Sequence, residues 1–544
     1  MRPESGETRP VRLLFVGILL VGAALRVAYL DRQVVLGDEL HPVRVAQEQS
    51  LGWILTHYRV QDNCIPITAC AWLLDRTVGL EELGFRALSW LPGILLVLLA
   101  LRASRTLLPA ADRALLGWLV AASPLLVFWS REARPYAAVS LLGPLALLAL
   151  VRWAHAGRRS DLLATAAAQA GLLYFNLPSA PFVGCLDLAG IVWGALAAPA
   201  GARLRGAWRM TLPGLVALAF TLALVGPALA SLREVLGEHE QWGSTWEERP
   251  GARTYLDAAQ LAFGFSRFHS GSPWQLLLAL PAALALLGLW RLCRRHPRVA
   301  LPALILLAGP ALAYASTAFI LIERGRVWLR YQAAAIPVLL FLCAYGWSGL
   351  RTAVAARWAA VARPLSAIAA ALLLAHALAG PLLDGVGPGR PFGLAFSRLF
   401  DAEPLTAGVG EGRAPAFYAD VPEGAVVVEW PPRHQWFDLY AAYQRMHGRA
   451  VMRWQAVETE HPGLAFRTFV FGRENIARRA PRGAFVVLHK DLGEERFFMR
   501  EGRRPTRADG VIRPTPIDPV LATCRSAFGE PVYEDEWLVV FRNG

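Results

Sequence analysis

Two adjacent carboxylates follow the first apolar stretch of the sequence. Asp38 and Glu39 lie in the run Leu36-Gly-Asp-Glu-Leu-His41. A carboxylate held at a membrane surface can act as a general base that accepts the proton of an attacking hydroxyl group. A plainer interpretation is that Asp38 caps a helix that begins near His41, because aspartate is a favoured N-cap residue. The two adjacent carboxylates alone do not distinguish a general base from a helix cap.

A cluster of arginines separates two later apolar stretches. The string Ser-Arg-Glu-Ala-Arg-Pro-Tyr, which ends at Tyr136, contains Arg131 and Arg134. Guanidinium groups form forked, charge-assisted hydrogen bonds with phosphate, so this pattern favours an anion site. Pro135 suits the first turn of the next helix, which predicts that the arginines lie at a corner between helices. The alternative is that they reach toward the membrane surface and pair with Glu132.

Further arginines are expected on the same side of the membrane. Arg330 and Tyr331 precede another apolar stretch, and Arg26 lies near the end of the first one. A carboxylate beside several arginines suits transfer of a group from a lipid phosphate. The carboxylate would activate the acceptor, and the arginines would stabilise the charge that develops on the departing phosphate.

The elements that must position these side chains are hydrophobic. Of the 544 residues, 55% are hydrophobic and 18% are charged, whereas soluble domains average about 45–50% apolar and about 25% charged residues. The sequence therefore predicts a polytopic α-helical membrane protein. Apolar runs close to the ~20 residues that cross a bilayer predict eleven transmembrane helices, at 13–30, 87–105, 113–130, 136–153, 161–177, 181–198, 210–230, 274–292, 299–320, 331–349 and 364–383.

Basic residues gather in six short segments between these runs, and the positive-inside rule assigns those segments to the cytoplasm. The loops 31–86 and 231–273 and everything after residue 384 are then extracytoplasmic, and the N terminus is cytoplasmic. We expect a multi-pass protein of a bacterial inner membrane. The net charge of +13 lies in short loops of the apolar part, which argues against a surface that binds nucleic acid.

The last 161 residues have a different character. From Asp384 onward the chain carries 21 basic and 21 acidic residues, so this part is neutral. Short apolar runs at 424–430, 483–489 and 536–542 predict buried strands, and 437–447 predicts a helix. The sequence thus predicts two domains, a transmembrane domain at 1–383 and an extracytoplasmic α/β domain at 384–544.

Taken in order, the motifs resemble those of the family 39 glycosyltransferases in the glycosyltransferase C superfamily. This family includes protein O-mannosyltransferases and the bacterial lipid A aminoarabinose transferase. The resemblance covers roughly residues 13–383, and the string that ends at Tyr136 is its most specific part. The motifs are Asp38-Glu39, Asp62-Asn-Cys-Ile-Pro66 where members often carry His-Pro-Pro-Leu, Gly84-Phe-Arg86-Ala-Leu-Ser89, Trp129-Ser-Arg-Glu-Ala-Arg-Pro-Tyr136 and Arg330-Tyr331.

The resemblance implies a membrane enzyme that moves one sugar, with inversion, from a polyprenyl-phosphate carrier to an acceptor on the outer face. The acceptor would be a protein, a lipid or a cell-wall glycan. By this resemblance Asp38 is the base, with Glu39 and Asp62 as further acidic residues of the site. The candidate ligands of the lipid phosphate are Arg26, Arg86, Arg131, Arg134, Tyr136, Arg330 and Tyr331.

Two points stay open at the acidic motifs. The His-Pro-Pro-Leu pattern is largely missing, which leaves His57 as a weak substitute for a histidine of the family. Asp38, Glu39 and Asp62 could hold a divalent cation through oxygen ligands, but no ligand spacing demands one. No other cofactor is expected.

Three other functions are consistent with this pattern. A ligase that transfers a whole glycan from a polyprenyl diphosphate would use similar arginines and a similar base. A transporter or flippase would also need many helices, although the predicted spans carry few charges. A non-catalytic scaffold would bind sugar through its C-terminal domain. The sequence does not name the sugar.

Overall fold

The chain folds into two compact units. One comprises Met1–Gln33 and His41–Pro404, and the other comprises Val34–Leu40 and Leu405–Gly544. The computed structural model describes residues 8–28, 30, 39–58, 64–78, 82–232, 262, 279–316, 330–358, 360, 364, 416–422, 425–430, 450–452, 480, 482–490, 506–507, 510–511, 517–535 and 538–544.

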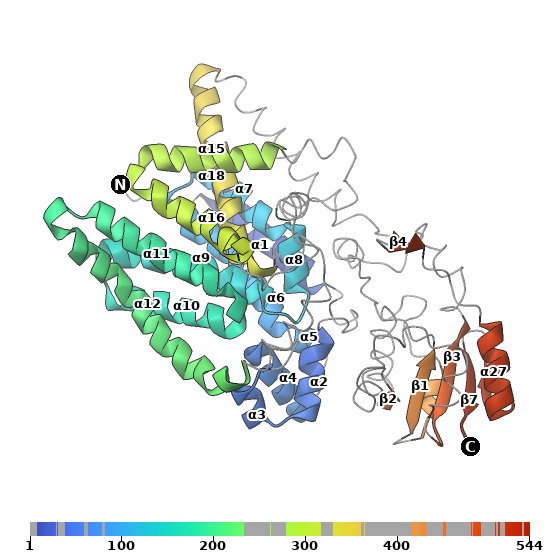
Figure 1. The fold of residues 1–544 in the computed structure, drawn as a ribbon. Coiled ribbons are helices and arrows are strands. Elements are labelled where there is room, and N and C mark those ends of the chain that lie inside the picture. Colours follow the sequence, from blue (N-terminus) through green and yellow to red (C-terminus); the bar gives the residue numbers. More distant parts are fainter. Residues whose placement is uncertain are drawn as a thin grey trace. The chain divides into compact units, whose positions relative to one another are not determined.

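In the part that the structure describes, the first unit is helical (Figure 1), and each of the first ten predicted transmembrane segments overlaps at least one helix. The eleventh, 364–383, lies outside the described residues except for Pro364. The long helices are α1 Arg9–Val27, α6 Ala87–Ala103, α7 Ala110–Ala121, α9 Tyr136–Ala156, α10 Arg159–Phe175, α11 Ala180–Ala197, α12 Arg203–Val225, α15 Ala279–Arg295, α16 Ala300–Ser316 and α18 Ile336–Arg357.

The described part contains five helical stretches that are long and apolar enough to cross a bilayer. Two further apolar helices are shorter, Ala87–Ala103 and Pro297–Ala313. The predicted class, a polytopic α-helical membrane protein, is confirmed, whereas the number eleven stays a prediction. The five stretches are Arg9–Val27, Tyr136–Ala156, Leu177–Ala197, Ala200–Leu232 and Ile336–Arg357.

One predicted helix is broken in two. The sequence predicts a single span over 113–130, but α7 ends at Ala121 and α8 comprises Pro124–Ser130. The Ser123 side chain accepts a hydrogen bond from the amide of Leu126, as an N-cap does. Proline fits the first turn of a helix and cannot donate to the turn before it, so the Ser-Pro pair ends one helix and starts another.

The long loop 31–86 also contains helices, of which the sequence predicts only a possible start near His41. They are α2 Leu40–Glu48, α3 Leu51–Thr56, α4 Ile65–Thr77 and α5 Glu82–Phe85. Helix α4 packs against α10, and α3 packs against the short 3₁₀ helix Gly226–Ala228 that follows α12. The amide of Tyr58 donates to the Ser231 hydroxyl at 2.7 Å, which ties the end of α3 to the end of the α12 segment.

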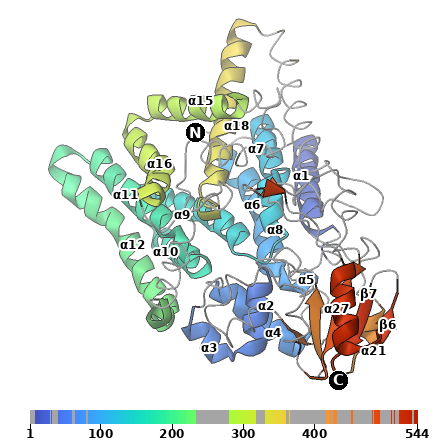
Figure 2. The same cartoon turned by 45° about the vertical axis from the view of Figure 1, so that its right-hand side comes forward.

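Glycines allow two helix pairs to approach closely, as is common within membranes. Helices α15 and α18 pack together at Gly288, where an added Cβ would overlap the backbone of Leu342 and Gly346. Helices α11 and α12 run side by side (Figures 1 and 2) and meet at Gly194, where a Cβ would lie 2.6 Å from the carbonyl oxygen of Gly206. Larger residues at these positions would force the helices apart.

Polar contacts join segments that the sequence assigns to the cytoplasmic side. Arg351, near the end of α18, forms an ion pair with Asp112 in the first turn of α7 at 2.8 Å. The guanidinium of Arg209 in α12 donates to the carbonyl oxygen of Trp153 in α9 at 3.0 Å. The start of α7 therefore lies at the same end of the bundle as the end of α18, as the predicted alternation of helices requires.

The second unit contains a five-stranded sheet in the order β2-β1-β3-β7-β6. Strands β2, β1 and β3 are parallel to one another, and β7 is antiparallel to both β3 and β6. Each of the three predicted strands coincides with one of β1, β3 and β7, whereas the predicted helix at 437–447 lies outside the described residues. The strands are β1 Val426–Trp430, β2 Ala450–Met452, β3 Phe485–His489, β6 Tyr533–Glu534 and β7 Leu538–Arg542.

Both faces of this sheet are covered. All five residues of β3 are buried, as expected for a central strand with helices on both sides. Val486 and Leu488 pack in one cluster with Cys524 of helix α27 (Asp518–Phe528). Val487 packs in the other cluster, with Phe417 of the short helix α21 (Phe417–Asp420). The unit is thus the small α/β domain that the sequence predicts. A separate pair of short strands, β4 and β5, comprises Thr506–Arg507 and Gly510–Val511.

Candidate active site

Arg131 joins the end of α8 to the end of α1. It is the C-cap residue of α8 and is only 3% exposed. Its Nη1 donates to the carbonyl oxygens of Ala28 at 2.8 Å and Leu25 at 3.3 Å. A cation is favourable at the C-terminal end of a helix, where the carbonyl groups carry partial negative charge. Both hydrogen bonds come from Nη1, and they fix the orientation of the Arg131 guanidinium.

Arg86 lies close to Arg131. It is the N-cap residue of α6, is fully buried and donates through Nη1 to the carbonyl oxygen of Leu30 at 3.2 Å. Burial, followed by the positive charge of Arg86, lowers the pKa of Arg131 to about 10. Arg131 therefore stays charged at neutral pH, and an anion bound beside the two guanidinium groups would offset their repulsion.

Arg134 is held by the turn between α8 and α9. Its amide donates to the carbonyl oxygen of Glu132 at 2.7 Å, and its own carbonyl accepts a hydrogen bond from the Ser89 hydroxyl at 3.2 Å. Ser89 is fully buried and lies in α6, three residues after Arg86. The hydrogen bond from Ser89 thus holds the turn that contains Arg134 against α6. Ser89 belongs to the predicted motif Gly84-Phe-Arg86-Ala-Leu-Ser89, but its sequence position alone does not predict a contact with Arg134.

Tyr136 and Arg330 are brought together from widely separated segments. The guanidinium carbon of Arg330 lies 5.5 Å from the ring centroid of Tyr136, within the range of a cation–π contact. The Ser140 hydroxyl lies 2.8 Å from the carbonyl oxygen of Tyr136 and 3.2 Å from that of Ala333. The segment that begins with Arg330-Tyr331, just before α18, is therefore fixed against the start of α9.

Arg26 is bound differently. It is fully buried in α1, and its guanidinium donates to the carbonyl oxygens of Gly22 at 2.9 Å, Ala121 at 2.9 Å and Val120 at 3.0 Å. The last two carbonyls belong to the final turn of α7. The structure thus places Arg26 between α1 and the last turn of α7, where its hydrogen bonds join the two helices.

The acidic motifs precede two helices of the long loop. Glu39 is 3% exposed and directly precedes α2, while Asp38 and Asp62 lie outside the described residues. Helix α4 begins two residues beyond Asn63, at Ile65, with Pro66 in its first turn. Asp38-Glu39 and Asp62 therefore stand in sequence immediately before the starts of α2 and α4.

His57 contacts residues of its own helix. It is exposed at the C-terminal end of α3, stacked on Trp53 at 4.7 Å, and its Nδ1 lies 3.1 Å from the Trp53 carbonyl oxygen. Among the residues that the structure describes, no group of three His, Cys, Asp or Glu side chains could hold a metal ion. A cation site at Asp38, Glu39 and Asp62 stays a prediction.

No protein-family model matches the sequence, and no curated protein matches it. Solved structures share its fold. ArnT from Cupriavidus metallidurans in the apo state aligns with a TM-score of 0.54 and 16% identity over 98% of both chains. The same protein bound to undecaprenyl phosphate aligns with a TM-score of 0.55 and 15% identity over 99% of both chains.

A second kind of structure is also similar. The archaeal oligosaccharyltransferase AglB from Archaeoglobus fulgidus, in complex with an inhibitory peptide and a dolichol-phosphate, aligns with a TM-score of 0.50 and 13% identity. The alignment covers 90% of this chain and 70% of AglB. At these identities the comparisons show a shared fold: the chain has the fold of ArnT and AglB over most of its length.

Proposed function

We propose that the chain is a membrane glycosyltransferase that moves a single sugar from a polyprenyl-phosphate carrier to an extracytoplasmic acceptor. The observation that carries this proposal is the convergence of three segments far apart in sequence. The start of α6, the corner between α8 and α9 and the segment before α18 bring together the buried or half-buried residues Arg86, Arg131, Arg134, Tyr136 and Arg330. A cluster of guanidinium groups is suited to a phosphate.

The structural comparisons support a lipid phosphate as the anion. ArnT has been solved with undecaprenyl phosphate, and AglB with dolichol-phosphate. Both ligands combine a phosphate with a long apolar chain. A bundle of apolar helices that presents arginines at one end can bind both parts of such a molecule.

In the proposed reaction the acceptor oxygen attacks the anomeric carbon of the donor sugar. The Asp38 carboxylate takes the acceptor proton as the new carbon–oxygen bond forms. The bond between the anomeric carbon and the phosphate oxygen breaks, and its electron pair stays on the phosphate, where Arg131 and Arg134 stabilise the added charge. A single displacement inverts the anomeric configuration. Glu39 and Asp62 orient the acceptor or the base.

A glycan ligase that uses a polyprenyl diphosphate is the second candidate. The similarity to AglB favours it, because AglB is an oligosaccharyltransferase. The ArnT alignments favour the single-sugar reaction, since they span both chains almost completely while 30% of AglB has no counterpart here. The number of phosphates on the released polyprenyl carrier distinguishes the single-sugar transferase from the glycan ligase.

The proposed topology puts the arginines on the outer side. Arg26 binds the last turn of α7, whereas Asp112 in its first turn pairs with Arg351, so the arginine cluster lies at the opposite end of the bundle from the predicted cytoplasmic loops. A thiol introduced near Gly510 should react with a membrane-impermeant maleimide in intact cells, and one near Arg205 should be protected. The reverse labelling would place the site in the cytoplasm and contradict the proposal.

The reaction itself can be followed on the native donor. Detergent-solubilised membranes from a strain that lacks this chain contain its unused donor and acceptor. Addition of the purified chain should convert a lipid-linked sugar into free polyprenyl phosphate, measured by mass spectrometry. A lipid pool that is unchanged after addition of the folded chain would argue for a transporter or a scaffold.

A further inference from the structure

The turn that leads into α18 is fixed against the start of α9. The Ser140 hydroxyl in α9 lies 3.2 Å from the carbonyl oxygen of Ala333, and a Cβ added at Gly143 would overlap the same turn. The amide of Ala335 closes the turn by donating to the carbonyl oxygen of Gln332 at 2.9 Å. The backbone at Gln332 is therefore held in one place next to α9.

Gln332 is buried in this turn, and its side-chain donor is unused. The residue is only 6% exposed, and its Nε2 has no hydrogen-bond partner among the residues that the structure describes. A buried polar group without a partner costs free energy, so such groups are rare in folded proteins and call for an explanation. The buried amide of Gln332 is suited to an acceptor that comes from outside the chain.

The surroundings of Gln332 favour an anion as that acceptor. Arg330 stands two residues earlier, and its guanidinium contacts the ring of Tyr136. Arg131 and Arg134 lie at the corner that precedes Tyr136. Phosphate oxygens are strong hydrogen-bond acceptors, and a neutral amide donates to them without adding positive charge to a cluster of guanidinium groups. A sugar hydroxyl would also accept a hydrogen bond, but it would not offset the charge of the arginines.

We infer that Gln332 is a further binding residue of the proposed site, and that its Nε2 donates to a phosphate oxygen of the lipid carrier. This inference rests on the proposed function, in which the arginines bind a polyprenyl phosphate. A structural role for Gln332 predicts a different result. If the side chain only fills space in the turn, methionine, which has a similar size and no donor, should leave the affinity for a lipid phosphate unchanged.

The test measures the binding of undecaprenyl phosphate and of undecaprenol to the purified full-length chain. Gln332→Met should weaken the affinity for undecaprenyl phosphate about tenfold, because a hydrogen bond to a charged group is lost, and should leave the affinity for undecaprenol unchanged. The Tm of the ligand-free variant should equal or exceed that of the wild type, since a buried donor without a partner is removed. Gln332→Glu should weaken the affinity for undecaprenyl phosphate further, because a carboxylate repels phosphate.

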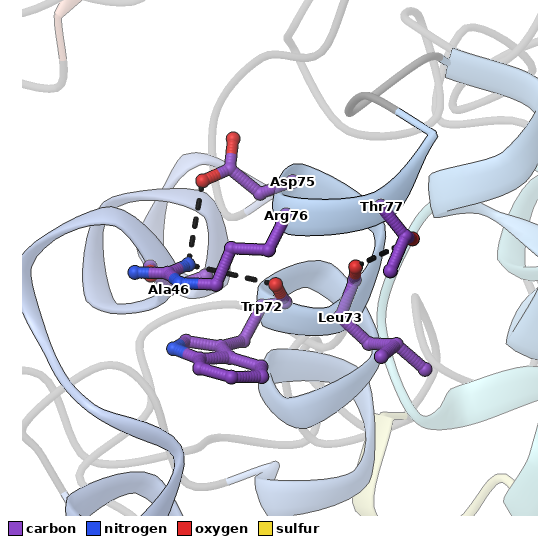
Figure 3. A network of polar contacts seen from close by, with 6 residues as sticks. All are labelled: Ala46, Trp72, Leu73, Asp75, Arg76 and Thr77. Atoms are coloured by element: carbon purple, nitrogen blue, oxygen red, sulfur yellow. Dashed lines mark hydrogen bonds and ion pairs between the residues drawn. The ribbon is translucent and has the colours of Figure 1, made fainter.

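Two controls separate this effect from general damage to the helix bundle. Gln169 is a fully buried glutamine whose Nε2 donates to Asp187 at 2.7 Å. Gln169→Met should therefore lower the Tm, while the folded protein keeps its Kd for undecaprenyl phosphate. Arg76→Ala removes a hydrogen bond to Ala46 and an ion pair with Asp75 at the end of α4 (Figure 3), and it should also leave this Kd unchanged.

Three results would each overturn the inference. They are a wild-type Kd of Gln332→Met for undecaprenyl phosphate, an equal loss of affinity for undecaprenyl phosphate and undecaprenol, and a loss of affinity that accompanies a fall in Tm. A wild-type chain that binds undecaprenyl phosphate no more tightly than undecaprenol would overturn the proposed phosphate site as well. The two failures are distinguishable, because the first three results leave the phosphate preference of the wild type intact.

Discussion

Replacement of Asp38 with asparagine should lower the rate of sugar transfer by about 10²–10⁴-fold, the usual loss when a general base is removed. Asparagine has nearly the same size and shape but cannot accept the acceptor proton. The variant should fold and insert normally, and its Kd for undecaprenyl phosphate should be close to that of the wild type, because the arginines are unchanged. The rate of polyprenyl phosphate release from solubilised membranes measures the loss.

A matched control separates loss of the base from loss of any carboxylate. Asp161→Asn removes an acidic residue at the predicted cytoplasmic end of the bundle, where Asp161 pairs with Arg152, and it should retain the wild-type rate. An Asp38→Asn variant with normal Tm and near-normal transfer would show that another group takes the proton. Glu39, the buried neighbour of Asp38, would then be the first residue to test.

Lysine at position 131 or 134 should not replace arginine. If these residues bind the lipid phosphate, lysine offers a point charge where arginine offers a planar fork with several donors. Each lysine variant should weaken undecaprenyl phosphate affinity or lower turnover by at least tenfold, and alanine should cost more. If the arginines only hold the helix ends together, lysine should lower the Tm and leave the undecaprenyl phosphate affinity of the folded protein unchanged, because Arg131 is only 3% exposed and donates to the backbone carbonyls of Leu25 and Ala28.

Arg26 provides the matched control for this series. It is also a buried arginine, but three hydrogen bonds join it to backbone carbonyls of α1 and α7. Arg26→Lys should therefore lower the Tm, while the folded protein keeps its affinity for undecaprenyl phosphate. Wild-type kinetics of both the Arg131→Lys and Arg134→Lys variants at matched Tm would remove the phosphate role from these residues. Loss of affinity in Arg26→Lys without loss of stability would make Arg26 a phosphate ligand.

The parts of the fold that the sequence predicts well are those set by local pattern. The runs around Val428, Val487 and Val540 are short, apolar and bounded by turn residues, and they form three adjacent strands. The apolar segments likewise coincide with helices. The break between α7 and α8 was missed because a Ser-Pro pair inside an apolar run leaves the hydropathy almost unchanged, although it carries an N-cap and a helix start.

The contacts of the buried arginines could not be predicted from the sequence. Arg26 and Arg131 look alike in sequence, since each stands at the edge of an apolar run. Their partners are distant: Arg26 binds a carbonyl 95 residues away, and Arg131 binds one 103 residues away. Local pattern cannot reveal such contacts, so the sequence predicts the same phosphate-binding role for both arginines and cannot predict which backbone carbonyls each one binds.

The most direct test of the proposed single-sugar transfer is the identity of the lipid carrier that the chain releases. Membranes from a strain that lacks this chain should accumulate a lipid with one sugar and one phosphate, and mass spectrometry should show its conversion to polyprenyl monophosphate when the purified wild-type chain is added, but not when Asp38→Asn is added. The mass of the accumulated lipid would also identify the sugar. Accumulation of a diphosphate-linked glycan and release of polyprenyl diphosphate would contradict the single-sugar reaction and assign the chain as a glycan ligase.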